Sequence, residues 1–506
     1  MLDRYLKMIL NSRVYDVAIE TPLVVADRLS ERMCNTVWFK REDLQPVHSF
    51  KLRGAYNKIA GLSDEKCVNG VIAASAGNHA QGVALAAKKR GVKALIIMPR
   101  TTPSIKVDSV RRLGARISLS GDTYDDAYTH AVEVAREKAM TFIHPYDDPE
   151  VIAGQGTIAL EVLREQEGEL HAIFVPVGGG GLIAGIAACV KALKPSIKVI
   201  GVEPDDAPCM YMALKKKRRV LLDQVGIFAD GVAVRQAGKE PYRIARRYVD
   251  EVLLVSTDEI CAAMKDIFDD CRAVVEPAGA LAVAGIKKYV VRSGITGERL
   301  VAINSGANIN FDRLRHVSER AEIGEYREAL LAVTIPEEPG SFRNFCQALG
   351  KRFITEFNYR YADARQAHVF AGIRLDGGEE ERHAIIGQLR TEGFPVEDLT
   401  DSEIAKLHIR YMVGGHAAGL KDEVLYRFQF PERPGALLKF LTSMGKRWNI
   451  SLFHYRNHGA DYGRVLAGIQ VPVESRKEFQ RFLDDLGYRY WEESGSTPYR
   501  LFLDGS

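Results

Sequence analysis

The stretch Arg41-Glu42-Asp43-Leu44-Gln45-Pro46-Val47-His48-Ser49-Phe50-Lys51-Leu52-Arg53-Gly54-Ala55 is the part of the sequence around which the rest is organised. Pro46 and the polar residues after it interrupt any regular element. Ser49 then stands where a capping serine would begin a helix. The apolar face of that helix consists of Leu52, Ala55, Tyr56 and Ile59. The sequence therefore predicts a helix capped by Ser49, with Lys51 in its first turn.

Lys51 is a candidate nucleophile because of this position. The positive end of a helix dipole disfavours an ammonium group, so a lysine in the first turn has a lowered pKa. An amine that is neutral near physiological pH can attack a carbonyl carbon and form a Schiff base. A solvated surface lysine is the commoner explanation for such a residue, so the choice between the two depends on motifs elsewhere in the chain.

The composition describes a globular protein without a nucleic-acid partner. The chain has 506 residues, of which 46% are hydrophobic and 27% charged, and its net charge is +3. A chain of this length predicts about two to four domains. The one basic cluster, Lys215–Arg219, lacks the interleaved aromatic residues of a nucleic-acid site and is interpreted as a solvated helix end.

A cytoplasmic protein is expected. The longest nearly uncharged apolar run, Val177–Val190, is too short to cross a bilayer, and residues 1–5 show no export signal. The seven cysteines are scattered without CxxC spacing, which favours reduced thiols over a disulfide framework or a zinc site. We therefore expect no membrane association.

Up to about residue 320, short apolar runs alternate with helical patterns. The clearest apolar runs are residues 70–74, 94–98 and 171–177. Continuous apolar strands between helices are typical of a parallel sheet covered on both faces. Ligands of such sheets bind at the carboxyl ends of the strands. The loops directly after the apolar runs are therefore the candidate sites.

The first such loop is Ser75-Ala76-Gly77-Asn78-His79, before a helix expected to begin near Ala80. Its backbone N–H groups and small side chains suit a carboxylate or another anion. The amide of Asn78 can bond a ring oxygen. His79 is better explained as a structural histidine than as a base.

The second loop contains four consecutive glycines, Gly178, Gly179, Gly180 and Gly181, followed by Leu182. Glycines let the backbone approach a phosphate from several sides, and the N-terminus of the following helix adds its dipole. The spacing fits neither the dinucleotide-binding fingerprint nor the P-loop. The run therefore predicts a monophosphate cup. A third loop, Asn304–Asn308, supplies the neutral hydroxyl group of Ser305 at another strand end.

Together these motifs resemble the serine/threonine dehydratases among the fold-type II enzymes that use pyridoxal 5'-phosphate. The match covers about residues 5–320. The resemblance implies an α/β catalytic body, residues 1–320, built from two parallel-sheet subdomains, with the smaller inserted at about 43–150.

The resemblance also implies a role for each motif. Lys51 holds the cofactor and then removes the Cα proton of the substrate, while Phe50 packs on the cofactor ring. Asn78 bonds the ring hydroxyl, and Ser305 faces the ring nitrogen. The phosphate is held by Gly178, Gly179, Gly180, Gly181 and Leu182. The substrate carboxylate is held by Ser75, Ala76, Gly77 and Asn78. The implied reaction converts L-threonine into 2-oxobutanoate and ammonia, and L-serine into pyruvate.

Two positions depart from relatives. Ala76 stands where related serine racemases carry a second serine, so no appreciable racemase activity is expected. Some relatives bind a cation near the position of Glu203, but Cys209 occupies the place of a possible oxygen ligand. No metal is therefore assigned.

An internal repeat follows residues 321–327, which are polar and are expected to link the two parts. Ile335–Ser341 recurs as Phe430–Ala436, and Phe357–Arg360 recurs as Phe453–Arg456. Each copy predicts a ferredoxin-like βαββαβ unit. The two units, residues 328–400 and 422–494, resemble α+β ACT-like regulatory domains.

A catalytic body with two ACT-like domains resembles the biosynthetic branch of the same dehydratase family. This implies the first step of isoleucine biosynthesis, inhibition by isoleucine, opposition by valine and a homotetramer. Tyr359 and Tyr455, at equivalent places in the repeats, are candidates for effector contact, and both equally suit a hydrophobic core.

Other functions stay open at this point. The repeats alone are compatible with a purely oligomeric role. The glycine run would also suit a nucleotide-binding or amino-acid-sensing protein whose catalytic body is inactive. Among enzymes with the same cofactor, β-replacement is an alternative, although the site for its second nucleophile is not evident.

Overall fold

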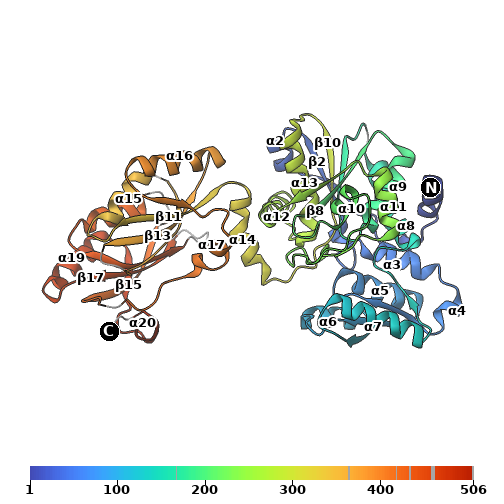
Figure 1. The fold of residues 1–506 in the computed structure, drawn as a ribbon, viewed down its shortest axis with the longest axis horizontal. Helices are drawn as coiled ribbons and strands as arrows, with labels where there is room; N and C mark the ends of the chain where they lie inside the picture. The colour runs from blue at the N-terminus through green and yellow to red at the C-terminus, as the bar shows by residue number, and fades with distance from the viewer. Residues whose placement is uncertain are drawn as a thin grey trace. The chain divides into compact units, whose positions relative to one another are not determined.

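The computed structural model describes residues 1–166, 168–350, 352–362, 365–417, 419–431, 435–456 and 462–503. The chain divides into two compact units, Met1–Ala321 and Glu322–Ser506 (Figure 1). In the part of the chain that is described, no helix is both long enough and apolar enough to cross a membrane.

The larger sheet of the first unit has six strands in the order β1-β2-β10-β7-β8-β9. Their bounds are β1 Leu23–Val25, β2 Thr36–Arg41, β10 Arg299–Asn304, β7 Ala172–Pro176, β8 Lys198–Pro204 and β9 Glu251–Val255. All neighbours pair in parallel except β1 and β2, which are antiparallel. The predicted parallel sheet is confirmed, apart from its short edge strand.

Helices cover both faces of this sheet (Figure 1). One face is covered by α8 (Pro149–Glu165), α9 (Gly181–Leu193) and α11 (Lys239–Tyr248). The other is covered by α2 (Asp27–Met33), α12 (Thr257–Cys271) and α13 (Pro277–Ser293). Strand β10 shows why the runs are continuously apolar: Val301 packs in one core and Ala302 in the other.

The smaller sheet has four parallel strands in the order β5-β4-β3-β6. Their bounds are β5 Arg116–Leu119, β4 Ala94–Met98, β3 Val71–Ala74 and β6 Thr141–Phe142. The accompanying helices are α3 (Lys51–Ala60), α4 (Asp64–Cys67), α5 (Asn78–Arg90), α6 (Ser104–Arg112) and α7 (Tyr124–Glu137). Helices α5, α6 and α7 gather around this sheet in a separate lobe of the unit (Figure 1).

The remaining helices of the first unit are short or lie at its ends. They are α1 (Leu2–Leu10), α10 (Cys209–Lys215) and α14 (Arg313–Gly324), whose last three residues belong to the second unit. Helix α1 buries Tyr5 and Ile9. The basic cluster begins at the end of α10 and is exposed from Lys215 to Arg218, as expected.

The second unit contains both repeats. The first comprises β11 (Glu328–Pro336), α15 (Ser341–Leu349), β12 (Ile354–Arg360), β13 (Gln366–Arg374), α16 (Gly378–Thr391) and β14 (Val396–Asp398). The second comprises β15 (Glu423–Pro431), α18 (Ala436–Met444), β16 (Asn449–Arg456), β17 (Tyr462–Gln470), α19 (Arg476–Leu486) and β18 (Arg489–Glu492). The predicted βαββαβ order is confirmed in both. The second copy of the turn motif, residues 432–434, lies outside the described residues.

The two repeats form one eight-stranded sheet, because β12 pairs antiparallel with β16. The four long helices pack on one face over a shared aromatic core that includes Phe345 and Phe440. On the other face each repeat carries a further short helix, α17 (Glu403–Leu407) or α20 (Thr497–Phe502). Each repeat is therefore longer than the six-element unit that the sequence predicts.

Candidate active site

The turn before Lys51 is held by tertiary contacts. Lys51 lies in the first turn of helix α3 as predicted, but the helix begins at Lys51 itself, its N-cap residue is Phe50 and no side chain caps it. The buried hydroxyl group of Ser49 has no hydrogen-bond partner among the described residues, so the prediction that Ser49 caps the helix is wrong. The physical reason is that Ser49 forms a backbone bridge with Gly306, while the Phe50 N–H donates a 3.1 Å hydrogen bond to the Ser305 carbonyl.

The Lys51 amine is a weaker base than an ordinary lysine. Burial lowers the pKa of Lys51 to about 8, while the charge of Glu276 opposes the shift. The amine nitrogen lies 5.1 Å from the centroid of the Phe50 ring. The lowered pKa agrees with the expectation for a nucleophile, but its main cause is desolvation rather than the helix dipole.

Asn78 contacts a buried carboxylate that the sequence analysis missed. Asn78 is the first residue of α5, so the helix begins two residues before the predicted Ala80. Its Nδ2 donates a 2.6 Å hydrogen bond to Oε1 of Glu276, the residue just before α13. Burial, aided by the charge of Asp230, raises the pKa of Glu276 to about 7. A glutamate before Pro277 was visible in the sequence, but only as a helix-start signal.

Asn308 joins three of the predicted motifs. Its Nδ2 donates to the Asn78 Oδ1 at 2.7 Å and to the Val47 carbonyl at 2.8 Å. It therefore connects the Asn304–Asn308 loop with the first predicted loop and with the turn before Lys51. In the same loop the buried Ser305 hydroxyl donates to the Ala278 carbonyl at 3.3 Å.

The four glycines form a cradle that admits no side chain. A Cβ atom on Gly179 would lie 2.3 Å from the Tyr146 ring, and one on Gly178 would lie 2.9 Å from the Val232 Cα. Gly180 has a φ of +93°, and a Cβ on Gly181 would lie 3.0 Å from Tyr146. Helix α9 begins at Gly181, and no side chain caps it in the described structure. Its first backbone N–H groups have no partner within the helix, so the cradle fits a phosphate group.

Tyr146 connects the cradle with Lys51. Its ring centroid lies 4.7 Å from that of His144. The pKa of His144 falls to about 4, mainly because it is buried, and the Lys51 charge adds to the shift. Phe50 and Leu182 also belong to one hydrophobic core. Phe50 and the end of the glycine cradle therefore border one hydrophobic core, and Lys51 is near enough to His144 for its charge to act there.

The loop predicted to hold a substrate carboxylate is partly open. Residues 75–78 are partly exposed, and the Gly77 N–H donates to the Ser75 hydroxyl at 3.2 Å. His79 is buried and its Nε2 lies 2.9 Å from the Ile143 carbonyl oxygen. The interpretation of His79 as a structural histidine is confirmed.

Glu203 and Cys209 lie together beside the cradle. The Glu203 carboxylate accepts hydrogen bonds from the Met210 and Tyr211 N–H groups, each at 2.8 Å, and its Oε1 lies 3.5 Å from the Cys209 thiol. Burial raises the pKa of Glu203 to about 8. The described residues contain no group of three or more histidine, cysteine or acidic side chains that would hold a metal ion.

The two candidate effector tyrosines belong to the core of the second unit. Tyr359 and Tyr455 are both buried, and they stand opposite Phe453 and Phe357 on the paired strands β12 and β16. The Tyr359 hydroxyl donates to Glu337, whose other oxygen accepts a 2.8 Å hydrogen bond from the Asn449 Nδ2. The Tyr359 hydroxyl therefore meets polar groups of both repeats.

Comparisons with known proteins identify the family of each part of the chain. Residues 14–306 match the family described as pyridoxal-phosphate dependent enzyme. Residues 319–409 and 414–503 each match the C-terminal regulatory domain of threonine dehydratase. Both matches to the regulatory domain extend beyond the last strand of their repeat, β14 or β18, and include the short helix that follows it, α17 or α20.

Individual relatives are similar over the whole chain. The L-threonine dehydratase biosynthetic IlvA of Burkholderia multivorans is 57% identical over 99% of both chains. The enzyme of the same name from Escherichia coli is 54% identical over 99% of this chain and 97% of its own.

Among solved structures, the processed form of threonine deaminase isoform 2 from Solanum lycopersicum has a TM-score of 0.63 at 49% identity, over 64% of this chain and 88% of that one. Maize serine racemase has a TM-score of 0.59 at 33% identity, over 62% of this chain and 96% of that one. The chain therefore belongs to the pyridoxal-phosphate dependent enzyme family, and within it to the biosynthetic threonine dehydratases.

Proposed function

We propose that this chain converts L-threonine into 2-oxobutanoate and ammonia at Lys51, the first step of isoleucine biosynthesis. The observation that carries the proposal is the Lys51 amine, whose pKa is lowered to about 8 by burial in a site shared with a four-glycine cradle. An amine of that pKa is substantially unprotonated at mildly alkaline pH, and it can then form a covalent bond with an aldehyde or accept a proton.

The residues present fit pyridoxal phosphate. Gly178 to Leu182 would hold its phosphate through backbone N–H groups, and Phe50 would pack against its ring. Asn78 would bond the ring hydroxyl, and the uncharged hydroxyl of Ser305 would face the ring nitrogen. When bound, the cofactor supplies an electron sink that acidifies the Cα–H bond of an amino acid.

The chain's own groups would orient the substrate and accept its Cα proton. The loop Ser75–Asn78 would orient the substrate by its carboxylate, with partly exposed backbone at the carboxyl end of β3. The Lys51 Nζ would accept the proton that leaves the substrate Cα. Ala76 offers no hydroxyl to protonate the opposite face of the substrate Cα, so the enzyme would not return a proton with inverted stereochemistry. L-serine would give pyruvate and no appreciable D-serine.

The second unit would carry the regulation. Two matches to a regulatory domain support effector binding in it. We assign isoleucine as the inhibitor and valine as its antagonist, with Tyr359 and Tyr455 as candidate contacts, in a homotetramer. The seven cysteines are free thiols, which supports a reducing, cytoplasmic setting.

The test combines activity with covalent labelling. The purified chain with pyridoxal phosphate should absorb in the visible region and release 2-oxobutanoate from L-threonine. Borohydride reduction and mass spectrometry of the digest should place the cofactor on Lys51. Lys51→Ala should not be labelled, and its kcat should be about 10⁴-fold lower than that of wild type. Lys58→Ala, in the same helix, should keep both. A label on another lysine, or none, would overturn the proposal.

A further inference from the structure

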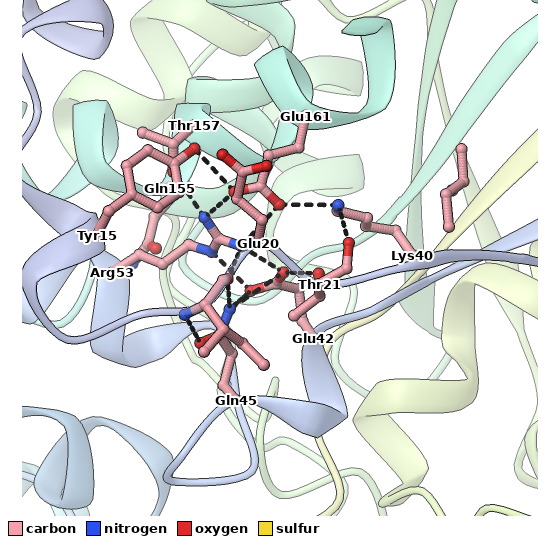
Figure 2. Close-up of polar contacts among 12 residues, drawn as sticks. Tyr15, Glu20, Thr21, Lys40, Glu42, Gln45, Arg53, Gln155, Thr157 and Glu161 are labelled. Carbon is pink, nitrogen blue, oxygen red and sulfur yellow. Dashed lines mark hydrogen bonds and ion pairs between the residues drawn. The ribbon is translucent and has the colours of Figure 1, made fainter. Parts of the chain in front are cut away.

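A buried cluster of charged side chains lies behind the Lys51 helix. The Arg53 guanidinium lies between the carboxylates of Glu42 and Glu161, and Lys40 contacts Glu161 from another side (Figure 2). All four side chains have 0% exposure. They come from β2, from the short helix Glu42–Leu44, from α3 and from α8.

Arg53 uses its whole guanidinium in this cluster. It reaches Glu42 through Nε at 2.8 Å and Nη2 at 2.7 Å, and Glu161 through Nη1 at 2.5 Å and Nη2 at 3.0 Å. Nη1 also donates to the Thr157 hydroxyl at 3.1 Å, and Nη2 to the Ile19 carbonyl at 3.2 Å. These two paired contacts have the fixed fork geometry that only arginine provides.

The carboxylates are satisfied from further directions. Glu161 accepts hydrogen bonds from the Lys40 ammonium at 2.8 Å and from the Tyr15 hydroxyl at 2.9 Å. Glu42 accepts one from the Thr21 hydroxyl at 2.6 Å. Burial opposes ionisation of Glu161, but the Arg53 and Lys40 charges hold its pKa below the ordinary value. Two cations therefore face two fully buried carboxylates, and Lys40 also pairs with the partly exposed Glu165 at 3.1 Å.

Arg53 acts on the backbone of α3 rather than on the Lys51 amine. Residues two apart on a helix do not face each other, so the two side chains leave α3 in different directions. Lys51 is the first residue of α3, and in the described structure no side chain caps this end. Without another anchor the first turn of such a helix is prone to fray. Arg53 is the third residue of α3, and its paired contacts with Glu42 and Glu161 anchor this first turn.

Helix α8 is the common support of Lys51 and the phosphate cradle. On one side, a Cβ at Gly154 would lie 2.8 Å from the Gly54 Cα, so α8 touches α3 directly after Arg53. On the other side, a Cβ at Gly185 would lie 2.7 Å from the Gly156 nitrogen, so α8 touches α9, the helix whose N-terminus forms the cradle. The distance between Lys51 and the cradle therefore depends on how α3 and α9 are held against α8.

The Arg53–Glu161 pair joins α3 to α8 beside this contact, two residues from Lys51. It acts together with the 3.2 Å hydrogen bond that the Gly54 N–H donates to the Gln155 side chain. We propose that Arg53 and Glu161 are positioning residues that fix the Lys51 amine at the distance from the glycine cradle that the aldehyde and phosphate of the cofactor require. This inference rests on the proposed function.

The test separates phosphate binding from covalent attachment. Pyridoxine 5'-phosphate has a hydroxymethyl group in place of the aldehyde, so it occupies the cradle without reacting with Lys51. Arg53→Lys keeps the charge and loses the fork. In the cofactor-free protein this variant should bind pyridoxine 5'-phosphate within about twofold of wild type. Its rate of borohydride-trapped attachment of pyridoxal phosphate to Lys51 should fall at least about tenfold, as small misplacements of reacting groups do.

Kinetics give a second readout. In the loaded Arg53→Lys enzyme, kcat for threonine should fall by a similar factor while KM changes less than about twofold. Glu161→Gln, which keeps the shape of the side chain, should also lower the attachment rate and kcat, and should leave pyridoxine 5'-phosphate binding and KM within about twofold of wild type. The control is Arg164→Met on the same helix, whose pair with Glu20 is 62% and 52% exposed and which should match wild type.

Three outcomes would overturn the inference. The first is an attachment rate and kcat within twofold of wild type in folded Arg53→Lys. The second is a parallel loss of pyridoxine 5'-phosphate binding, which would show a general structural role. If Arg53→Lys yields no folded protein, the same two criteria are applied to Glu161→Gln. The third outcome is that neither variant folds. A wild-type protein that neither attaches pyridoxal phosphate nor converts threonine would instead overturn the proposed function.

Discussion

The side-chain amide of Asn78, in the smaller subdomain, donates a 2.6 Å hydrogen bond to the carboxylate of Glu276, in the larger one. Glu276 is 4% exposed, and its carboxylate also interacts with the Lys51 charge. The hydrogen bond therefore connects the two halves of the catalytic body at the point where the proposed cofactor ring would lie.

Glu276 should make stability depend on pH. Its folded-state pKa of about 7 exceeds the ordinary value of 4.5, so the folded state retains a proton that the unfolded state loses. Glu276 therefore leaves stability unaffected below pH 4.5, lowers it progressively up to pH 7, and lowers it by ~3 kcal/mol above that.

Glu276→Gln removes this ionisation. Denaturant unfolding of the cofactor-free protein should show the variant gaining stability relative to wild type as the pH is raised from 5 to 8. Glu65→Gln, an exposed site on α4, should show no such trend. A constant difference between Glu276→Gln and wild type across this range would contradict the prediction.

Gly180→Ala should weaken cofactor binding. Gly180 has a φ of +93°, and a Cβ there would lie 2.5 Å from the Met210 Cε. The left-handed backbone alone costs an alanine roughly 1–2 kcal/mol, and the clash adds to it. We expect the pyridoxal phosphate dissociation constant, measured by absorbance titration, to rise at least about tenfold.

A matched control is Gly294→Ala, whose φ is +66° and whose added Cβ meets nothing within 4 Å. It should lower the unfolding temperature slightly and leave cofactor affinity unchanged. Equal effects of the two substitutions on affinity would show that backbone strain, and not the shape of the cradle, determines the result.

Arg360→Met should destabilise the second unit. The Arg360 guanidinium contacts Glu423 at 2.5 Å and the Leu503 carbonyl at 2.6 Å, and the Glu423 side chain is 5% exposed. Removing the cation leaves a buried carboxylate without its ion-pair partner, which costs about 3–5 kcal/mol. The free energy of unfolding from a denaturant titration measures this cost.

The control for Arg360 is Arg427→Met. Arg427 pairs with Glu493 at 3.0 Å on the surface, where the side chains are 48% and 29% exposed. Surface pairs of this kind contribute about 0–1 kcal/mol. If the free energy of unfolding falls equally in the two methionine variants, the buried pair contributes no more to stability than the surface pair.

Tyr359→Phe tests the effector assignment. The substitution removes the hydroxyl group that donates to Glu337 and leaves the ring in the core. If this hydroxyl takes part in effector binding, threonine saturation curves without isoleucine should stay unchanged, and the isoleucine concentration for half inhibition should rise about 5-fold or more.

Tyr361→Phe, two residues along the same chain segment, is the comparison. Isoleucine should inhibit this variant at the same concentration as wild type, because Tyr361 is only partly buried at the edge of that core. Curves for Tyr359→Phe that superimpose on wild type with and without isoleucine would leave Tyr359 as a core residue only.

Local sequence patterns determined much of this protein. The alternation of apolar runs with helices specified the two sheets, and the repeated turn and strand motifs specified the βαββαβ order of the tail. The Lys51 helix and the glycine run were also visible. Side-chain period, glycine freedom and turn chemistry depend on residues close in the chain, so one sequence suffices to predict them.

The tertiary structure decided the rest. Ser49 had the chemistry of a cap, but pairing with Gly306, far along the chain, determines its position. In the sequence Glu276 is only a residue before a helix, and its contact with Asn78 of the other subdomain is visible only in the structure. In the same way, the sequence does not show that Glu42 and Glu161 enclose Arg53. Burial and partners of a charged group depend on which distant segments approach it, and the spacing of residues along the chain does not contain that information.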